Sequence, residues 1–255
     1  MTVCTTLITG ASQGLGLGLV RHLLEVDQTN KIIACVRDKA SCDKVLHDLM
    51  TKHQSRLMIC HMDVAVPESV KVSAAAIESA YFVNPCRQAL SEIENGFGKD
   101  GIDSLICNAG VASATDATPT KTTGDDLKSS MLVNLYGVIN STICLLPCLR
   151  KGHKKHIFVV SSEYGSLHSP CSEKPSSTAY SVSKAAANMW TKKLAAELGP
   201  EGFTVVAFHP GTVDTGMTEG GEDPKTAAKK CCDNIILAKP QNGKFLNAQG
   251  QEMPW

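Results

Sequence analysis

The sequence has no excess of charge of either sign, since 25 lysine and arginine residues balance 25 aspartate and glutamate residues. A chain without net charge lacks the general attraction that draws basic proteins to nucleic acid or to an anionic bilayer. We therefore expect no nucleic-acid partner and no membrane partner, and any basic binding site has to be local.

The sequence also lacks the segments that direct a chain into or across a membrane. Residues 1–9 show no basic start, apolar run or small-residue cleavage site of a secretory signal. The uninterrupted apolar runs are of strand length, as at 157–160, and fall short of the roughly 20 residues that span a bilayer. The prediction is a protein that is neither exported nor embedded in a membrane.

The eleven cysteines include no C-x-x-C motif and no histidine-rich partner spacing, so the sequence indicates neither a disulfide framework nor a metal site. Most stand in apolar stretches such as 33–36, where a reduced thiol packs like a small apolar side chain. This favours a cytoplasmic location. The pairs Cys231/Cys232 and Cys144/Cys148 leave a redox-reactive alternative, although no nearby residue suggests a lowered thiol pKa.

The composition is that of an ordinary globular chain, with 43% apolar and 20% charged residues. The length of 255 residues suits one α/β domain, which commonly has roughly 200–250 residues. Neither an internal repeat nor a low-complexity linker divides the chain. We predict a single domain over residues 1–255.

Short apolar runs alternate with longer stretches of helical period, which indicates repeated βαβ units. The predicted strands lie at residues 3–9, 31–36, 57–61, 102–107, 156–161, 204–209 and 244–246. The predicted helices lie at residues 14–24, 41–52, 66–93 (interrupted at Asn84-Pro85), 125–149, 178–198 and 225–237. The strands lack polar alternation, as strands buried on both faces do. The predicted fold class is α/β, a single-domain Rossmann-like doubly wound parallel sheet with helices on both faces.

Ligands of such sheets bind beyond the carboxyl ends of the strands. The loops at 110–120, 163–177 and 210–224 follow predicted strands. We expect them to hold the substrate.

A glycine-rich segment, Thr9–Gly16, connects the first predicted strand to the first predicted helix. Glycines let the backbone approach a pyrophosphate, and the helix points its free N–H groups and positive dipole end at the negative charge. We expect the dinucleotide phosphates to be bound by Gly10, Ser12, Gln13, Gly14, Leu15 and Gly16. The alternative, a plain strand-to-helix turn, is disfavoured by this placement.

The end of the second predicted strand bears on the choice of dinucleotide. NAD binders place an acid there for the ribose hydroxyls, whereas NADP binders tend to place an arginine near the 2′-phosphate. Val36 stands at the position of the acid and Arg37 follows it, which favours NADP(H). Asp38 and the uncharged Gln13 weaken this assignment. NAD(H) is the alternative, with Arg37 as a solvated surface charge.

Tyr180 and Lys184 stand four apart at the start of a predicted helix, so that the phenol and the ammonium share one face. Hydride delivery to a carbonyl creates an alkoxide, which needs a proton donor with a pKa below that of free tyrosine, about 10. A positive charge within about 4–6 Å lowers such a pKa by one to three units. The pair alone is weak evidence, but Ser162, Asn134 and the segment 108–110 are expected near the same rim.

In this order, the motifs resemble those of the short-chain dehydrogenase/reductase family. The resemblance covers nearly the whole chain and rests on Thr9–Gly16, Asn108-Ala109-Gly110, Asn134, Ser162, the Tyr180/Lys184 pair and Pro210–Thr215. The ending, from Asn242 through Gly250 to Pro254-Trp255, further resembles the sniffer and C-factor group of carbonyl reductases.

The resemblance implies four catalytic roles. Tyr180 is the expected acid/base, and Lys184 is expected to lower the Tyr180 pKa and hold the nicotinamide ribose. Ser162 is expected to hydrogen-bond the substrate oxygen; Ser161 is its rival, disfavoured because in the family pattern two residues and then glycine follow the serine. Asn134 is expected to support a water relay to Lys184.

The resemblance also extends the cofactor site beyond Tyr180 and Lys184. The implied contacts come from Asp63 and Val64 at the adenine, from Asn108, Ala109 and Gly110 along the cofactor, and from Pro210, Gly211, Val213 and Thr215, the last two near the carboxamide. Two of these residues have alternative roles as caps, Asp63 of the next helix and Thr215 of a loop helix.

The sequence departs from the family pattern at three positions, none of which removes a catalytic atom. Cys107 replaces a frequent asparagine, Gln13 a frequent basic residue of NADPH users, and Thr212 a frequent tryptophan of the sniffer-like group. The gap from Ser162 to Tyr180 is wider than usual and predicts an extra polar loop beside the pocket. His168 in that loop is a candidate substrate contact, with a solvated loop histidine as the favoured alternative.

Together these observations predict an NADPH-dependent, metal-free reduction of an aldehyde, ketone or quinone, with Tyr180 as proton donor. The alternatives are NAD-linked alcohol oxidation and a dinucleotide-binding regulator without catalysis, which the complete set of catalytic residues argues against. The predicted helices at 125–149 and 178–198 suggest a homodimer contact, as the family resemblance implies.

Overall fold

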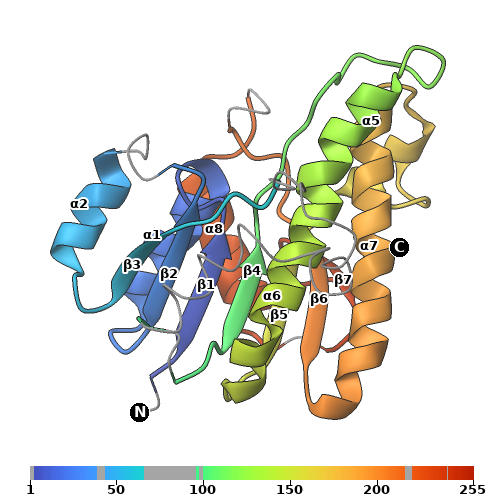
Figure 1. Cartoon of the computed structure of the whole chain (residues 1–255). Helices are drawn as coiled ribbons and strands as arrows, with labels where there is room; N and C mark the ends of the chain where they lie inside the picture. The colour runs from blue at the N-terminus through green and yellow to red at the C-terminus, as the bar shows by residue number, and fades with distance from the viewer. Residues whose placement is uncertain (1–2, 39–43, 66–95, 98–99, 216–219, 240) are drawn as a thin grey trace, which may run out of the picture.

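The computed structural model describes residues 3–38, 44–65, 96–97, 100–215, 220–239 and 241–255. Within this part of the chain, seven parallel strands form one sheet in the order β3-β2-β1-β4-β5-β6-β7 (Figure 1). The strands are β1 (Thr5–Thr9), β2 (Lys31–Val36), β3 (Leu57–His61), β4 (Ser104–Cys107), β5 (His156–Val160), β6 (Thr204–His209) and β7 (Phe245–Asn247). All seven predicted strands are present, with ends that differ by up to two residues.

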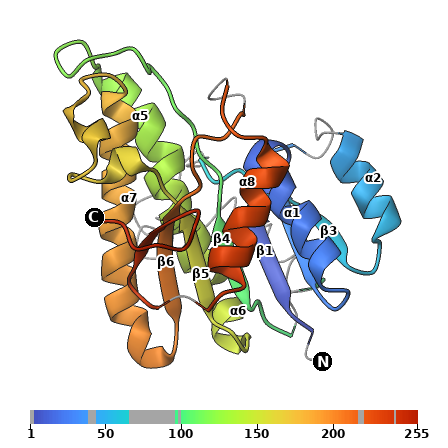
Figure 2. The same cartoon turned by 180° about the vertical axis from the view of Figure 1, so that it is seen from behind.

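Helices cover both faces of the sheet, which confirms the predicted doubly wound α/β fold (Figures 1 and 2). One face carries α1 (Gly14–Val26), α2 (Lys44–Lys52) and α8 (Pro224–Cys231), and the other carries α5 (Gly124–Met131), α6 (Gly137–Lys151) and α7 (Thr178–Leu198). The helix predicted at 66–93 lies outside the described residues. The prediction of one domain over the whole chain therefore stays a prediction.

The continuous apolar character of the strands follows from this burial on two sides. In β1, Leu7 packs with the core beneath α6 and α7, whereas its neighbour Ile8 packs with the core beneath α1 and α8. In β6, Val205 and Val206 divide between the same two cores. Successive side chains of a strand point to opposite faces, so a sheet covered twice has no polar face to alternate with.

Two helix starts are set by capping residues that stand just before the predicted boundaries. Thr123 and Asp126 form a capping box, in which each side chain accepts a hydrogen bond from the other residue's backbone N–H. Asp223 caps α8 by accepting from the backbone N–H of Thr226 at 3.0 Å, and Pro224 occupies the first helical position. These caps place the start of each helix one residue before the predicted one.

The helical run Gly124–Lys151 is long and apolar enough, by length and composition, to cross a membrane. The expectation that no segment reaches such a length was therefore too strict, because it counted only consecutive apolar residues. In the structure 44% of the most apolar window of the run is buried, and α6 packs against β4 and β5, as a core helix does. The predicted cytoplasmic location stays a prediction.

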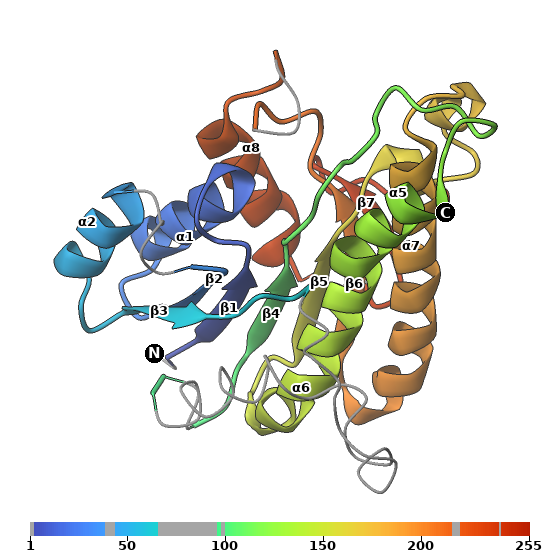
Figure 3. The same cartoon turned by 45° about the horizontal axis from the view of Figure 1, so that its top comes forward.

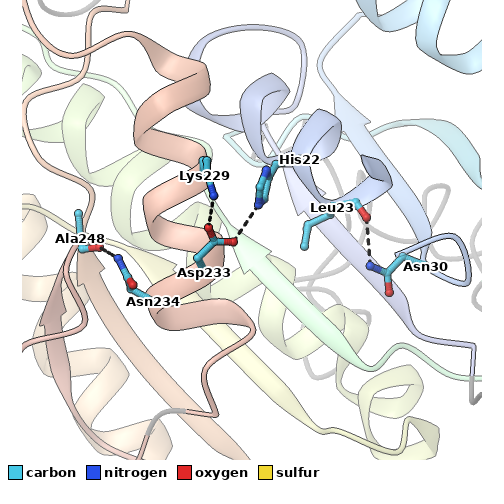
Figure 4. Close-up of polar contacts among 7 residues, drawn as sticks. All are labelled: His22, Leu23, Asn30, Lys229, Asp233, Asn234 and Ala248. Atoms are coloured by element: carbon cyan, nitrogen blue, oxygen red, sulfur yellow. Dashed lines mark hydrogen bonds and ion pairs between the residues drawn. The ribbon is translucent and has the colours of Figure 1, made fainter. Parts of the chain in front are cut away.

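Helices α1 and α8 approach each other closely at Gly18, where an added Cβ would lie 2.7 Å from the carbonyl oxygen of Pro224. Polar contacts add to this packing (Figure 4). Asp233 accepts from Lys229 and also contacts Nε2 of His22 on α1 at 3.0 Å. Helix α1, which follows the glycine-rich segment, is thus braced against α8.

The strand order reverses between β1 and β4, so the connections from their carboxyl ends diverge and leave a crevice at the edge of the sheet. Figure 3 views this edge from above, with α1 and α8 on one side, α5 and α7 on the other, and the connection from β4 to α5 rising between them. The predicted site residues all belong to this region or to its walls.

Candidate active site

A cleft of about 520 Å³ runs along the carboxyl edge of the sheet. It is lined by the following predicted site residues: Gly10, Ser12, Gln13, Gly14, Leu15, Gly16, Arg37, Asp63, Val64, Asn108, Ala109, Gly110, Ser162, Tyr180, Lys184, Pro210, Gly211, Val213 and Thr215. Asn134 is the one predicted site residue that does not line it. Segments far apart in the sequence therefore meet in one elongated cleft.

The glycine-rich segment forms the first wall of the cleft, and its glycines are required by close packing. Gly10 has φ +64°, and a Cβ there would lie 2.8 Å from Cα of Ala109. A Cβ at Gly16 would lie only 2.3 Å from the carbonyl oxygen of Gly10. Helix α1 begins at Gly14, and the side chain of its N-cap residue, Gln13, makes no capping hydrogen bond. The first-turn N–H groups are thus left for a ligand phosphate.

Asn108 braces this wall from β4. Its Nδ2 donates to the carbonyl oxygens of Thr9 and Gly10, at 2.9 and 3.0 Å, and its backbone N–H donates to the hydroxyl of Thr9 at 3.1 Å. The side chain therefore holds the turn between β1 and α1 in place. Its predicted contribution to cofactor binding stays a prediction.

The far end of this wall carries the residues predicted to meet the adenosine part of a dinucleotide. Arg37 is exposed and lines the cleft directly after β2. Asp63 lines it after β3, and its carboxylate accepts from the backbone N–H of Ala65 at 2.9 Å. Val64 is buried against Gly137. The helix that Asp63 was alternatively expected to cap lies outside the described residues.

The opposite end of the cleft brings Ser162 and Tyr180 together. Both side chains line the cleft, and hydrogen bonding from Ser162 acts on the pKa of the Tyr180 phenol. One turn along α7, Lys184 is buried, with its ammonium donating to the carbonyl oxygen of Val160 at 2.8 Å and lying 5.7 Å from the centroid of the Tyr180 ring. The predicted convergence of a phenol, an ammonium and a hydroxyl is present.

Burial shifts the pKa values of both Tyr180 and Lys184. It raises the pKa of the Tyr180 phenol above its ordinary value, and the hydrogen bond to Ser162 opposes the rise. Burial also lowers the pKa of the Lys184 ammonium to about 8. The net direction is upward, since removal of the phenol from water has the largest effect, and the expectation that Lys184 lowers the Tyr180 pKa stays a prediction.

Asn134 lies behind the cleft, in a π-helical turn, Leu132–Tyr136, that joins α5 to α6. Its buried side chain accepts from the backbone N–H of Val111 and donates to the carbonyl oxygen of Val111 and to the Ser183 hydroxyl, each at 2.9 Å. Asn134 therefore fixes the loop after β4 to α7, the helix that carries Tyr180 and Lys184. Its predicted part in a water relay stays a prediction.

The two adjacent serines after β5 have different partners. Ser161 donates to the side-chain oxygen of Asn188, whose amide donates to the carbonyl oxygen of Gly165 at 3.1 Å. Ser162 instead reaches Tyr180 and accepts from the backbone N–H of Tyr164 at 3.3 Å. Ser161 is therefore committed to holding the loop, which leaves Ser162 as the serine placed for a substrate oxygen.

The wider gap between Ser162 and Tyr180 contains two 3₁₀ turns, Glu163–Gly165 and Pro170–Glu173. Cys171 and Lys174 from this segment line the cleft. His168 does not; it is exposed, and its Nδ1 lies 3.4 Å from the backbone oxygen of Trp255. The loop bounds the site as expected, without a contribution to the cleft wall from His168.

Several wall residues were not among the individual sequence predictions, and three of them carry polar side chains close to the predicted catalytic end: Glu163, Tyr164 and His209. The first two lie in the loop that was expected to hold substrate, but nothing in the sequence distinguished them from its other polar residues. His209 ends β6, and a histidine at the end of a strand does not by itself indicate which residues it will contact. Only the pairing of β5 with β6 brings it beside Glu163.

The adjacent Cys231 and Cys232 are buried at the end of α8. Burial raises the pKa of the Cys231 thiol to about 12 and that of Cys232 well above its ordinary value. A thiol with a raised pKa forms little of the reactive thiolate. The structure supports the packing role of this pair and argues against the redox-reactive alternative.

A crevice at the switch point of a parallel sheet, with a glycine-rich turn at one end and a Ser–Tyr–Lys group at the other, defines the class of nicotinamide-dependent oxidoreductases. The chain belongs to one family of this class, because the family model for short chain dehydrogenase matches residues 4–225.

Individual relatives agree with this assignment. The short chain dehydrogenase gsfK of Penicillium aethiopicum is 30% identical to the chain over 273 residues, which cover 98% of this chain and 99% of the relative. Two solved structures, the carbonyl reductase Sniffer of D. melanogaster and an NADPH-bound carbonyl reductase from chicken fatty liver, each match with a TM-score of 0.83 at 27% identity, over 100% of both chains.

Proposed function

We propose that the protein reduces an aldehyde, ketone or quinone to the alcohol with NADPH. The observation that carries this proposal is the meeting of Ser162, Tyr180 and the buried Lys184 in one wall of a cleft that begins with a phosphate-binding turn. Two hydroxyls in one cleft wall offer a carbonyl oxygen two hydrogen-bond donors. The similarity to the two carbonyl reductases supports the same reaction.

The cleft suits a dinucleotide in shape and polarity. Because Gly10 and Gly16 lack a Cβ, the backbone packs closely beneath the N-terminal end of α1, whose N-cap side chain makes no capping hydrogen bond. Arg37 supplies a guanidinium at the position for a 2′-phosphate, and the similarity to an NADPH-bound carbonyl reductase supports the choice of NADP(H). NAD(H) with alcohol oxidation is the alternative that a comparison of the two dinucleotides separates.

In the proposed reaction, bound NADPH supplies the hydride for the carbonyl carbon. Ser162 orients the carbonyl oxygen, and the Tyr180 phenol gives that oxygen a proton as it gains negative charge. Lys184 donates to the resulting phenolate or to the ribose nearby, and Asn134 keeps the helix that carries both residues in register with the loop after β4. The raised pKa of Tyr180 keeps the phenol protonated until charge develops beside it.

We further propose that two copies of the chain associate through α5, α6 and α7. Tyr136 and Ile143, seven residues apart, are 46% and 42% exposed, and Val182 and Met189, also seven apart, are 44% and 61% exposed. A spacing of seven places each pair on one side of its helical run. The two runs lie side by side on one face of the sheet (Figure 1). Light scattering that gives a monomer mass would exclude this dimer.

The test of the proposed function is NADPH oxidation, followed by absorbance, with a broad panel of aldehydes, ketones and quinones. Tyr180→Phe keeps the ring that packs in the cleft and removes the proton, so we expect NADPH binding to persist while turnover falls by about 10³-fold or more. Turnover close to that of the wild type would refute the role of Tyr180. Tight NADPH binding without turnover of any carbonyl would favour a non-catalytic regulator.

A further inference from the structure

Glu163 and His209 face each other in the wall of the cleft, beside Ser162. Glu163 directly follows Ser162, and His209 ends β6. The two residues are held by the pairing of β5 with β6, which continues past the strand end as the backbone N–H of Ser161 donates to the carbonyl oxygen of Phe208 at 2.7 Å. Their positions are therefore set by the sheet rather than by a long loop.

The distance between the two side chains does not match a direct hydrogen bond. Nε2 of His209 lies 3.8 Å from Oε1 of Glu163, whereas such bonds are about 2.7–3.2 Å long. One oxygen atom about 2.8 Å from each of these atoms would bridge them with ordinary hydrogen bonds. The side chains are 15% and 34% exposed, so such an atom can arrive from the cleft.

The chemistry of the pair selects the bridging group. The Glu163 carboxylate only accepts hydrogen bonds, and the ring of His209, with its proton on Nε2, donates one. A hydroxyl both donates and accepts, so it satisfies both partners. A carboxylate would be repelled by Glu163, and an ammonium, although it could pair with Glu163, has no lone pair to accept the Nε2 proton of His209. An alkyl group would leave Glu163 desolvated without a donor.

The state of the histidine agrees with this assignment. Its Nδ1 is buried without a hydrogen-bond partner among the described residues. A proton added to Nδ1, which would make the ring cationic, therefore has no acceptor there. Burial lowers the pKa of His209, and the Glu163 carboxylate opposes this only in part. The neutral ring is therefore the form that meets a ligand near neutral pH.

The adjacent wall adds a flat surface. The ring of Tyr164 meets that of Tyr180 edge to face, with centroids 6.2 Å apart and planes inclined by 66°. Both rings line the cleft. A planar ring that carries the reacting carbonyl can pack there with favourable aromatic geometry.

We propose that Glu163 and His209 form a recognition site for a hydroxyl group of the substrate, so that the enzyme prefers hydroxylated aromatic carbonyl compounds. This inference rests on the proposed carbonyl reduction and assigns its substrate class. The pair contacts the substrate without taking part in the transfer of the hydride or of the Tyr180 proton. It acts on specificity, measured as kcat/KM.

The experiment compares benzaldehyde, its ortho, meta and para hydroxy derivatives, and the corresponding methoxy derivatives, each with NADPH. A methoxy group keeps an acceptor oxygen but cannot donate to Glu163. We expect at least one hydroxy isomer to exceed its methoxy partner in kcat/KM by roughly 10-fold to 100-fold, because a site built to pair with a hydroxyl rejects an analogue that lacks the proton.

Two variants and a matched control assign this preference to the pair. Glu163→Gln and His209→Gln should each bring the hydroxy-to-methoxy ratio close to one. Glu173→Gln makes the same chemical change on an exposed residue of the neighbouring 3₁₀ turn that does not line the cleft, and it should keep the wild-type ratio.

The outcomes separate the two proposals. Turnover of benzaldehyde with ratios near one for every isomer, or a preference that survives both variants, would overturn the recognition site alone. No NADPH oxidation with any member of the series or of the broader carbonyl panel would overturn the proposed reduction and the recognition site with it.

Discussion

Ser162, just beyond β5, and Tyr180, in the first turn of α7, line the same cleft, and the Ser162 side chain acts on the pKa of the Tyr180 phenol. The cleft thus holds the two hydroxyls that a carbonyl oxygen needs, and hydrogen bonding from Ser162 opposes the burial-driven rise of the Tyr180 pKa. The neighbouring Ser161 is turned toward Asn188. The two serines therefore offer a matched pair of substitutions with different expected effects.

Ser162→Ala should lower kcat by roughly 10²–10³-fold, because it removes one of the two donors for the carbonyl oxygen. It should also shift the phenol's apparent pKa in the pH–rate profile upward. Ser161→Ala leaves the Asn188 oxygen without its donor and should instead lower the free energy of unfolding by about 1–3 kcal/mol. Steady-state kinetics and urea unfolding of both variants test the assignment, which reversed effects would contradict.

Asn134→Ala should destabilise the fold and the site together. The substitution leaves the backbone N–H and carbonyl of the half-buried Val111 without their side-chain partners, and each lost hydrogen bond costs about 0.5–1.5 kcal/mol. We expect the free energy of unfolding to fall by about 3 kcal/mol and kcat to fall as α7 loses its tie through Ser183. Asn140→Ala, a half-buried position on the same helical run, is the control and should change both quantities little.

Lys184 should give the stability of the ligand-free protein a pH dependence of unusual sign for a lysine. Burial lowers its pKa from 10.5 to about 8, so between these pH values the unfolded chain keeps a proton that the folded protein has released. The free energy of unfolding therefore rises with pH in this window. Below about pH 8 the folded protein also holds the proton, so the full cost of burying the charged ammonium lowers the free energy of unfolding.

The measurement is urea unfolding of the wild type and of Lys184→Met at several pH values. Relative to the variant, the wild type should gain up to about 3 kcal/mol on going from neutral pH to the upper end of this window. All other lysines are shared by the two proteins and cancel in the comparison. A difference that stays constant with pH would show that Lys184 keeps its proton when buried.

The parts of the site that are local in sequence could be predicted well. The segment Thr9–Gly16 contains its turn, its glycines and the start of its helix within a few residues, and the structure places it as expected. Tyr180 and Lys184 share a helix face because their spacing alone sets it. The parallel sheet follows in the same way from the alternation of strands and helices, whereas the order of its strands was not predicted.

Other features depend on contacts that a linear pattern does not contain. The partnership of Glu163 and His209 exists only because β5 pairs with β6 in one register. The π-helical turn at Leu132–Tyr136 differs from an α-helix by a shift in hydrogen bonding, which the spacing of apolar residues does not reveal. The sign of the Tyr180 pKa shift was missed because the depth of burial is a property of the folded cleft.

Arg37→Ala should change the choice of dinucleotide rather than the chemistry. The guanidinium is exposed at the cleft wall, where it can form two parallel hydrogen bonds to a 2′-phosphate. We expect KM for NADPH to rise by roughly 10-fold or more, since hydrogen bonds to a charged group contribute about 1.5–3 kcal/mol, while KM for NADH changes little. An equal effect on both dinucleotides would indicate that Arg37 has no contact with the phosphate.

Trp255→Ala should loosen the loop that borders the substrate end of the cleft. The Trp255 ring stacks on Phe245 with centroids 5.5 Å apart, and the preceding carbonyl oxygen, that of Pro254, accepts from the Ser166 hydroxyl at 2.8 Å. Without the stack, residues 254 and 255 lose their anchor and release the segment that leads to Cys171 and Lys174.

We expect KM for the carbonyl substrate to rise several-fold and KM for NADPH to stay constant, because the phosphate-binding turn lies at the other end of the cleft. His168→Ala, which removes only one long contact to Trp255, is the control and should have a smaller effect.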